Sequence, residues 1–97
     1  VNQVFSQSSS TYINFTKGHI GHSMGAAGAL ELAGNLGSFD DGIVHFGKNA
    51  EEIDPDCEMK NLVIKESKLV GNIESILNNS FGMLGINSTV IVKKYNK

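Results

Sequence analysis

The sequence predicts an α/β fold in which one main helix packs on a mixed or antiparallel sheet of short strands. The helix is predicted from a run of small and helix-forming residues at 23–36. The sheet is predicted from short segments rich in β-branched and aromatic residues, of which residues 89–92 have the strongest pattern. A chain of 97 residues can bury only a modest core, so we expect at most one small domain.

The first segments of the chain predict a helical turn followed by a strand. Residues 1–7 are apolar at Val1, Val4 and Phe5, which is a helical spacing and indicates the last turns of a helix. Residues 8–10 are serines and predict a turn. Residues 11–15 are rich in β-branched and aromatic side chains and predict a short strand.

The main helix is predicted by a stripe of apolar residues three positions apart. Ser23 is expected to cap its N-terminus and Gly37 to end it. Because each glycine inside a helix costs about 1 kcal/mol relative to alanine, the glycines of this helix predict close contact with another element. The apolar stripe consists of Met24, Ala27, Leu30 and Ala33.

The second half of the chain predicts further strands and one glycine-rich loop. Residues 40–42 are expected to form a turn, and residues 42–56 to be largely irregular. The glycine-rich segment at 80–87 is expected to be a loop with unusual backbone geometry. The predicted strands are residues 61–66, 72–78 and 88–94.

Composition excludes several classes of function. The net charge is -2 and no basic stripe is present, which argues against a nucleic-acid partner. No apolar run approaches about 18 residues, so no membrane span is expected. A single cysteine cannot form an internal disulfide, which fits a reducing, cytoplasmic location. His19 and His22 have no carboxylate or cysteine at ligand spacing, so we expect no metal and no cofactor.

The stretch at 16–31 concentrates the reactive groups, and two general motifs compete for it. Residues 21–25 read Gly-His-Ser-Met-Gly and fit the nucleophile elbow of hydrolases, but that fold needs a larger sheet and an acid followed by a histidine. Only His45 follows Ser23. A phosphate-binding loop is also weakly supported, because the lysine-Ser/Thr pair after the last glycine is missing.

Two separate blocks resemble the β-ketoacyl-acyl-carrier-protein synthases. Lys17, then Gly-His at 21–22 and Gly-Ala-Ala-Gly at 25–28 resemble one block of that family. Residues 79–87, Asn-Ser-Phe-Gly-Met-Leu-Gly-Ile-Asn, resemble a second. The order and the approximate separation of the blocks also match. The resemblance implies a thiolase-like fold, of which residues 1–97 would be a partial, C-terminal domain.

This resemblance implies a decarboxylative Claisen condensation in fatty-acid or polyketide synthesis. His22 would bind the malonyl thioester carbonyl, Lys17 would support the site electrostatically, and the backbone N–H of Met83 would contribute to the oxyanion hole. Phe81 and Gly82 would contact the substrate, although Phe81 taken alone would be a core aromatic residue. The implied partners are acyl carrier protein and a second copy of the chain in a homodimer.

Several features depart from the family pattern. The nucleophilic cysteine and the first histidine of the family would lie upstream, so the chain alone is not expected to catalyse. Cys57 is flanked by carboxylates, which disfavour a reactive thiolate. Met83 and Leu84 stand where the family has phenylalanine and glycine. The alternative is a stand-alone, non-catalytic interaction module. His19 is expected at the surface and His45 in a structural role.

Overall fold

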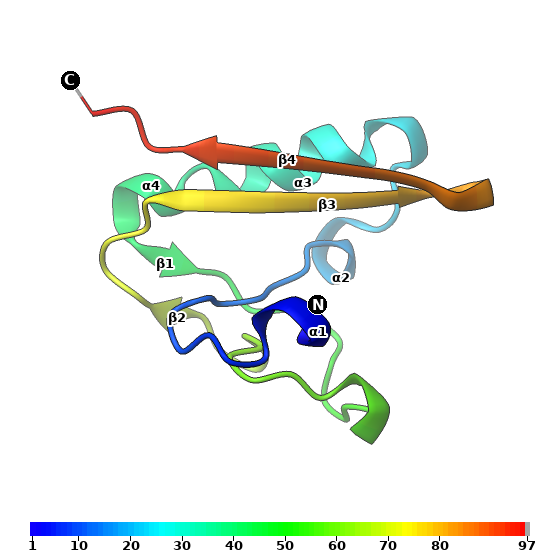
Figure 1. Cartoon of the computed structure of the whole chain (residues 1–97), viewed down its shortest axis with the longest axis horizontal. Coiled ribbons are helices and arrows are strands. Elements are labelled where there is room, and N and C mark those ends of the chain that lie inside the picture. The colour runs from blue at the N-terminus through cyan, green and yellow to red at the C-terminus, as the bar shows by residue number, and fades with distance from the viewer. Residues whose placement is uncertain (97) are drawn as a thin grey trace.

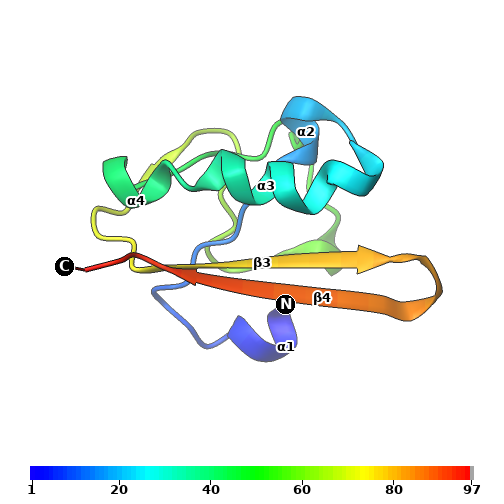
Figure 2. The same cartoon turned by 90° about the horizontal axis from the view of Figure 1, so that it is seen from above.

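The computed structural model of the chain describes residues 1–96. Figures 1 and 2 show helix α3 lying along one face of a long β-hairpin, with the remaining short elements beside and beneath them. The helices are α1 (Asn2–Phe5), α2 (Lys17–Ile20), α3 (Ala27–Asn35) and α4 (Ser38–Asp41). Single 3₁₀ turns occur at Met24–Ala26, Pro55–Cys57 and Met83–Gly85. The strands are β1 (Ile43–Val44), β2 (Lys68–Leu69), β3 (Ser75–Gly82) and β4 (Ile86–Lys93).

The contact between α3 and β3 confirms that one main helix packs on a sheet. Alternate residues of β3 are half-buried, as expected for a strand with one covered face. One of them, Asn78, donates from Nδ2 to the carbonyl oxygen of Gly28 across 3.1 Å. A Cβ atom on Gly28 would lie 3.1 Å from Oγ of Ser80. The predicted close contact of a helix glycine is therefore confirmed at Gly28.

The predicted bounds and caps of the main helix are wrong. The chain first makes a 3₁₀ turn, and α3 itself runs only from Ala27 to Asn35. The side chain of Ser23 makes no capping hydrogen bond. Gly37 has helical angles and leads directly into α4, whereas Gly42 adopts a left-handed φ of 69° where α4 ends. Gly42 is therefore the glycine that stops the helical region, because its missing Cβ permits this conformation. The last turn of α4 also replaces part of the turn predicted at 40–42.

The N-terminal helical turn is confirmed as α1. In place of the strands predicted at 11–15 and 61–66, the structure has only isolated β-bridges. Ile13 pairs in parallel with Leu62, and the 61–66 segment also pairs with Gly47 through Ile64. Asn61 and Lys65 have φ values of 63° and 71°. Because these angles interrupt an extended backbone, longer ladders cannot form on either side.

A short two-stranded sheet lies in segments where no strand was predicted. Strand β1 pairs antiparallel with β2, with Ile43 opposite Leu69 and Val44 opposite Lys68. Each strand has two residues, which is too short for an alternating pattern to be visible in the sequence. The prediction that residues 42–56 are irregular is otherwise consistent with the structure.

The two C-terminal strands are confirmed, but they extend into the segment predicted to be a loop. They pair antiparallel over eight residue pairs, from Ser75 opposite Lys93 to Gly82 opposite Ile86. Only residues 83–85 form the tip, where Leu84 has a left-handed φ of 64°. The sheets are thus two separate antiparallel pairs, and the isolated parallel bridges lie outside both of them.

The structure is open and has little interior. Among the described residues, Val63 is the one buried hydrophobic core residue, and it is still 6% exposed. The solvent-accessible surface is 7322 Å², whereas a folded monomer of this mass typically exposes about 5,400 Å². The apolar stripe of α3 and the outer face of the hairpin therefore remain available for contact with further protein. Within the described part of the chain, no helix is both long and apolar enough to cross a membrane.

Candidate active site

An ion pair joins the two helices of the first sequence block. Nζ of Lys17, on α2, contacts Oε1 of Glu31, on α3. The Lys17 side chain is 49% exposed, whereas that of Glu31 is only 15% exposed. The sequence prediction did not include Glu31. Its signal was present, because Glu31 is the one charged residue between 23 and 36.

A large cavity is lined both by this ion pair and by one of the predicted substrate-contacting residues. The cavity has a volume of about 790 Å³, which is within the range of small-molecule sites. Lys17 and Phe81 both line it, although they lie in the two different sequence blocks. Its lining includes apolar Leu77 of β3 and Ile91 of β4, and the charged residues of α2 and α3 that form the ion pair. Lining residues used below are Asn14, Thr16, Lys17, Glu31, Asn35 and Phe81.

His22 lies in the turn between α2 and α3 and its ring is oriented by the backbone. The N–H of Met24 donates to Nδ1 of His22 across 3.3 Å. Met24 has a φ of 53°, a strained conformation for a residue with a side chain. Because Nδ1 accepts, the neutral ring carries its proton on Nε2. His22 is exposed, so this Nε2–H can be donated to a ligand.

The nucleophile-elbow interpretation fails at its serine. Oγ of Ser23 is buried and has no hydrogen-bond partner among the described residues. A serine nucleophile needs a histidine within hydrogen-bonding reach of its hydroxyl. No such base is present, and the backbone strain of this turn falls on Met24 rather than on Ser23.

The hairpin tip carries the remaining predicted residues. Met83 is 89% exposed and Phe81 is 73% exposed. Gly82 packs tightly across the hairpin, since a Cβ atom there would lie 3.2 Å from Cβ of Ile86. Figures 1 and 2 both show the tip at the same end of the molecule as the turn that leads into α3. His22, Gly82 and Met83 do not line the cavity that holds Lys17 and Phe81.

The other two histidines converge on one carbonyl group. Nε2 of His19 lies 2.7 Å from the carbonyl oxygen of Phe46, and Nδ1 of His45 lies 3.2 Å from the same atom. The two rings meet edge to face with centroids 5.5 Å apart. His19 is exposed, as predicted, yet it anchors α2 to residue 46. Within the described residues, no three metal-ligating side chains gather into a site.

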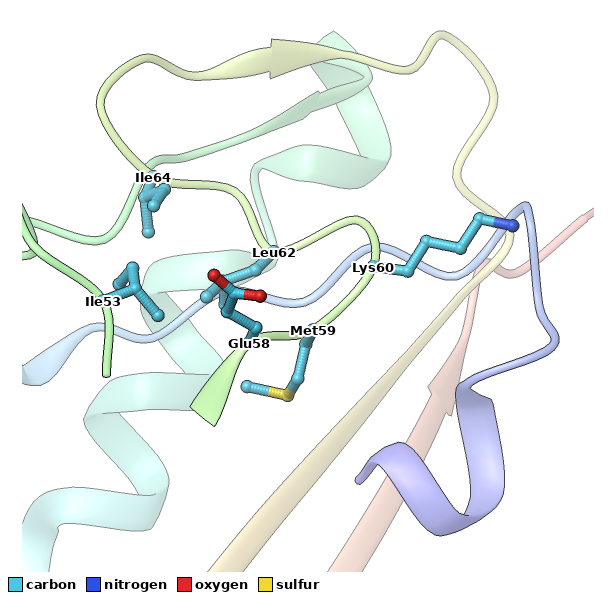
Figure 3. A pocket seen from close by; sticks show the side chains of 6 residues that line it. All are labelled: Ile53, Glu58, Met59, Lys60, Leu62 and Ile64. Carbon is cyan, nitrogen blue, oxygen red and sulfur yellow. The ribbon is translucent and has the colours of Figure 1, made fainter. Parts of the chain in front are cut away.

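A second cavity lies apart from these groups. Its volume is about 510 Å³, and apolar side chains make up most of its lining. Figure 3 shows the Glu58 carboxylate among these apolar side chains and Lys60 directed away from them. None of the predicted site residues lines it. The exposed thiol of Cys57 lines neither cavity. The lining residues are Ile53, Glu58, Met59, Lys60, Leu62 and Ile64.

Comparison with known proteins identifies the family. Residues 1–51, which carry Lys17, His22 and Glu31, match the family described as beta-ketoacyl synthase, C-terminal domain. The chain belongs to this family. The match confirms the family resemblance and the α/β class. No solved structure matches significantly.

Three relatives share this similarity over most of the chain. The chain is 39% identical over 84 residues to 3-oxoacyl-acyl-carrier-protein synthase 1 of Haemophilus influenzae, which covers 87% of this chain and 20% of that protein. It is 37% identical over 91 residues to the chloroplastic synthase II of Arabidopsis thaliana, covering 94% and 17%. It is 32% identical over 94 residues to synthase 1 of Escherichia coli strain K12, covering 97% and 22%. The chain thus spans about a fifth of the length of these relatives.

Proposed function

We propose that this chain is the C-terminal part of a 3-oxoacyl-acyl-carrier-protein synthase that extends an acyl chain by decarboxylative Claisen condensation. The observation that carries the proposal is the Lys17–Glu31 ion pair at the wall of a cavity that also includes Phe81. These residues come from two blocks far apart in the sequence. The names of the three relatives support the same reaction.

In this reaction, His22 acts on the malonyl thioester. The bond between the malonyl methylene carbon and its carboxylate breaks, CO₂ leaves, and the electron pair forms an enolate. Negative charge develops on the thioester oxygen, so a hydrogen-bond donor aimed at that oxygen lowers the barrier. The neutral His22 ring can supply this donor from Nε2, because Nδ1 accepts from Met24.

The enolate carbon then attacks an acyl thioester, and the acyl-bearing thiolate leaves as the new carbon–carbon bond forms. We assign the backbone N–H of Met83 to the oxyanion formed in this step. Phe81 and Gly82 would contact the acyl chain, and the exposure of Phe81 is compatible with that role. The chain's own thiol, Cys57, is exposed and outside both cavities, so the acyl-bearing cysteine would lie in other sequence.

The ion pair contributes charge and fixed geometry to the site. Glu31 is mostly buried and neutralises Lys17, so the ammonium group is held in place instead of moving freely in solvent. An ion pair with one exposed partner contributes less than about 1 kcal/mol to stability. Its contribution to the reaction would be to orient the Lys17 ammonium group. The proposed substrates are acyl and malonyl thioesters of acyl carrier protein, and the proposed assembly is a cytoplasmic homodimer.

The second candidate is a non-catalytic interaction module. The large exposed surface favours association with other protein, whether or not the chain takes part in chemistry. The two candidates differ in what they require of His22. An interaction module needs only a folded turn at that position, whereas the synthase needs a hydrogen-bond donor.

The test is the rate of malonyl-acyl-carrier-protein decarboxylation by the intact synthase that carries this chain. His22→Ala should lower the rate about 100-fold, as loss of one oxyanion donor does in other enzymes. His45→Ala is the matched control and should retain the rate, because the His45 side chain contacts the Phe46 carbonyl oxygen and the His19 ring and does not line the cavity. An unchanged rate in His22→Ala would remove this residue from the reaction and favour the interaction module.

A further inference from the structure

The Lys17–Glu31 ion pair spans two helices whose relative position the intervening chain does not fix. Lys17 begins α2, and Glu31 lies in the middle of α3. The connection at 21–26 consists of an irregular stretch and a single 3₁₀ turn, and it includes two glycines. Glycine adds conformational freedom to such a connection. Another contact must therefore set the distance between the two charged side chains.

One side chain of α3 bonds the residue just before α2, beside the ion pair. Nδ2 of Asn35 donates to the carbonyl oxygen of Glu31 across 2.6 Å. The same Nδ2 donates to Oγ1 of Thr16 across 3.4 Å, and Thr16 is the residue directly before Lys17. The amide of Asn35 thus contacts the backbone that carries the carboxylate and the residue adjacent to the ammonium. All four of these residues line the same cavity.

A second amide fixes the orientation of the first. Nδ2 of Asn14 donates to Oδ1 of Asn35 across 2.9 Å and lies 3.4 Å from the carbonyl oxygen of His45. With Oδ1 accepting from Asn14, the Nδ2 of Asn35 faces Thr16 and Glu31 with its two N–H groups. The opposite orientation would set Oδ1 against the Glu31 carbonyl, two acceptors without a proton between them. Both amides are half-buried, which raises the cost of such a mismatch.

We propose that Asn35 is a positioning residue for the Lys17–Glu31 ion pair, a role that rests on the proposed synthase function. Asn35 acts through its two donated hydrogen bonds and does not itself touch the substrate. Asn14 holds the Asn35 amide in the orientation that makes both bonds. Without them, the segment before α2 can shift relative to α3, and the ammonium and carboxylate groups separate.

The test uses Asn35→Asp in the intact synthase. Aspartate has nearly the size and shape of asparagine, but as an ionised group it only accepts hydrogen bonds. Both donated bonds are therefore lost with little change in volume. We expect kcat for malonyl decarboxylation to fall about tenfold, because small displacements of catalytic groups are costly, while KM changes little. The control is Asn96→Asp, which alters an exposed amide that lines neither cavity and should keep the wild-type rate.

A double-mutant cycle separates positioning from a general loss of structure. In a Glu31→Gln background the ion pair is already lost, so Asn35→Asp should cause little further loss of kcat. Full additivity of the two effects would mean that Asn35 acts independently of the pair. Thr16→Val should reproduce part of the Asn35→Asp effect, whereas Thr16→Ser, which keeps the hydroxyl group, should not.

A crystal structure of the Asn35→Asp synthase gives a readout that does not depend on activity. The inference expects Nζ of Lys17 and the Glu31 carboxylate to lie more than about 4 Å apart, beyond ion-pair distance. An intact ion pair in this variant would overturn the positioning role, whatever the rate. Decarboxylation at the wild-type rate by Lys17→Met would instead count against the proposed function. The effect of Asn35→Asp on the geometry of the ion pair would not be affected by that result.

Discussion

Asn78 on β3 donates a hydrogen bond to the carbonyl oxygen of Gly28 on α3, across 3.1 Å and a sequence separation of 50 residues. Gly28 ends the glycine-alanine block that follows His22, and Asn78 directly precedes the second block at 79–87. This bond therefore holds the two blocks of the family resemblance against each other. The interface leaves little room for a side chain at residue 28.

The first prediction concerns the fit between Gly28 and Ser80. Gly28→Ala should change the free energy of unfolding little, because a gain of up to about 1 kcal/mol in helix propensity is offset by the 3.1 Å contact with Oγ of Ser80. In a Ser80→Ala background the contact is relieved, and Gly28→Ala should become stabilising. Urea denaturation of the four proteins measures the difference.

The matched control for this cycle is Gly34. A Cβ atom at Gly34 would meet nothing within 4 Å. Gly34→Ala should therefore stabilise the chain by the same amount with or without Ser80→Ala. If the effects of Gly28→Ala and Ser80→Ala on the free energy of unfolding were additive, the close approach of α3 and β3 would not restrict the size of the side chain at residue 28.

The second prediction concerns the strained hairpin tip. Leu84 has a left-handed φ of 64° and is fully exposed, so its side chain gains no packing in return. Asparagine tolerates this conformation better than leucine, so Leu84→Asn should raise the free energy of unfolding by about 1 kcal/mol. Met83→Asn is the control: Met83 is also exposed but lacks a positive φ, and its substitution should change stability little. Equal effects at the two positions would contradict the strain argument.

The third prediction concerns association of the isolated chain. On the face of the hairpin opposite to α3, Leu77 lies across from Ile91, and these residues are 42% and 63% exposed. An apolar patch beside an unpaired strand edge favours self-association. Sedimentation equilibrium at micromolar concentration should therefore give a mass above the 10.4 kDa of one chain.

Substitutions test whether this face is responsible. Ile91→Lys should return the mass toward that of the monomer, because it places a charge in the centre of the patch. Tyr95→Lys removes an aromatic residue outside β4 that is even more exposed, at 83%, and should leave association unchanged. A wild-type chain that sediments as a monomer and melts cooperatively would show that the exposed surface is tolerated without a partner.

Local patterns in the sequence predicted the main elements of the fold. The spacing of apolar residues in 23–36 indicated the helical region, and the β-branched residues of 88–94 indicated the last strand. These signals depend on residues two to four positions apart, which meet within a single element. The glycines of the helix also indicated close packing, and the contact of Gly28 with β3 confirmed it.

Sequence by itself therefore determined the α/β class, the main helix, the final hairpin strand and the family of the chain. Tertiary structure alone decided which residues meet: Glu31 with Lys17, Asn35 with Thr16, and Gly28 with β3. It also decided that residues 11–15 and 61–66 form single bridges and that the hairpin continues to residues 82 and 86. The physical reason is that these contacts join residues far apart in the chain. They stabilise the protein only once the intervening chain has folded back and brought the two residues together.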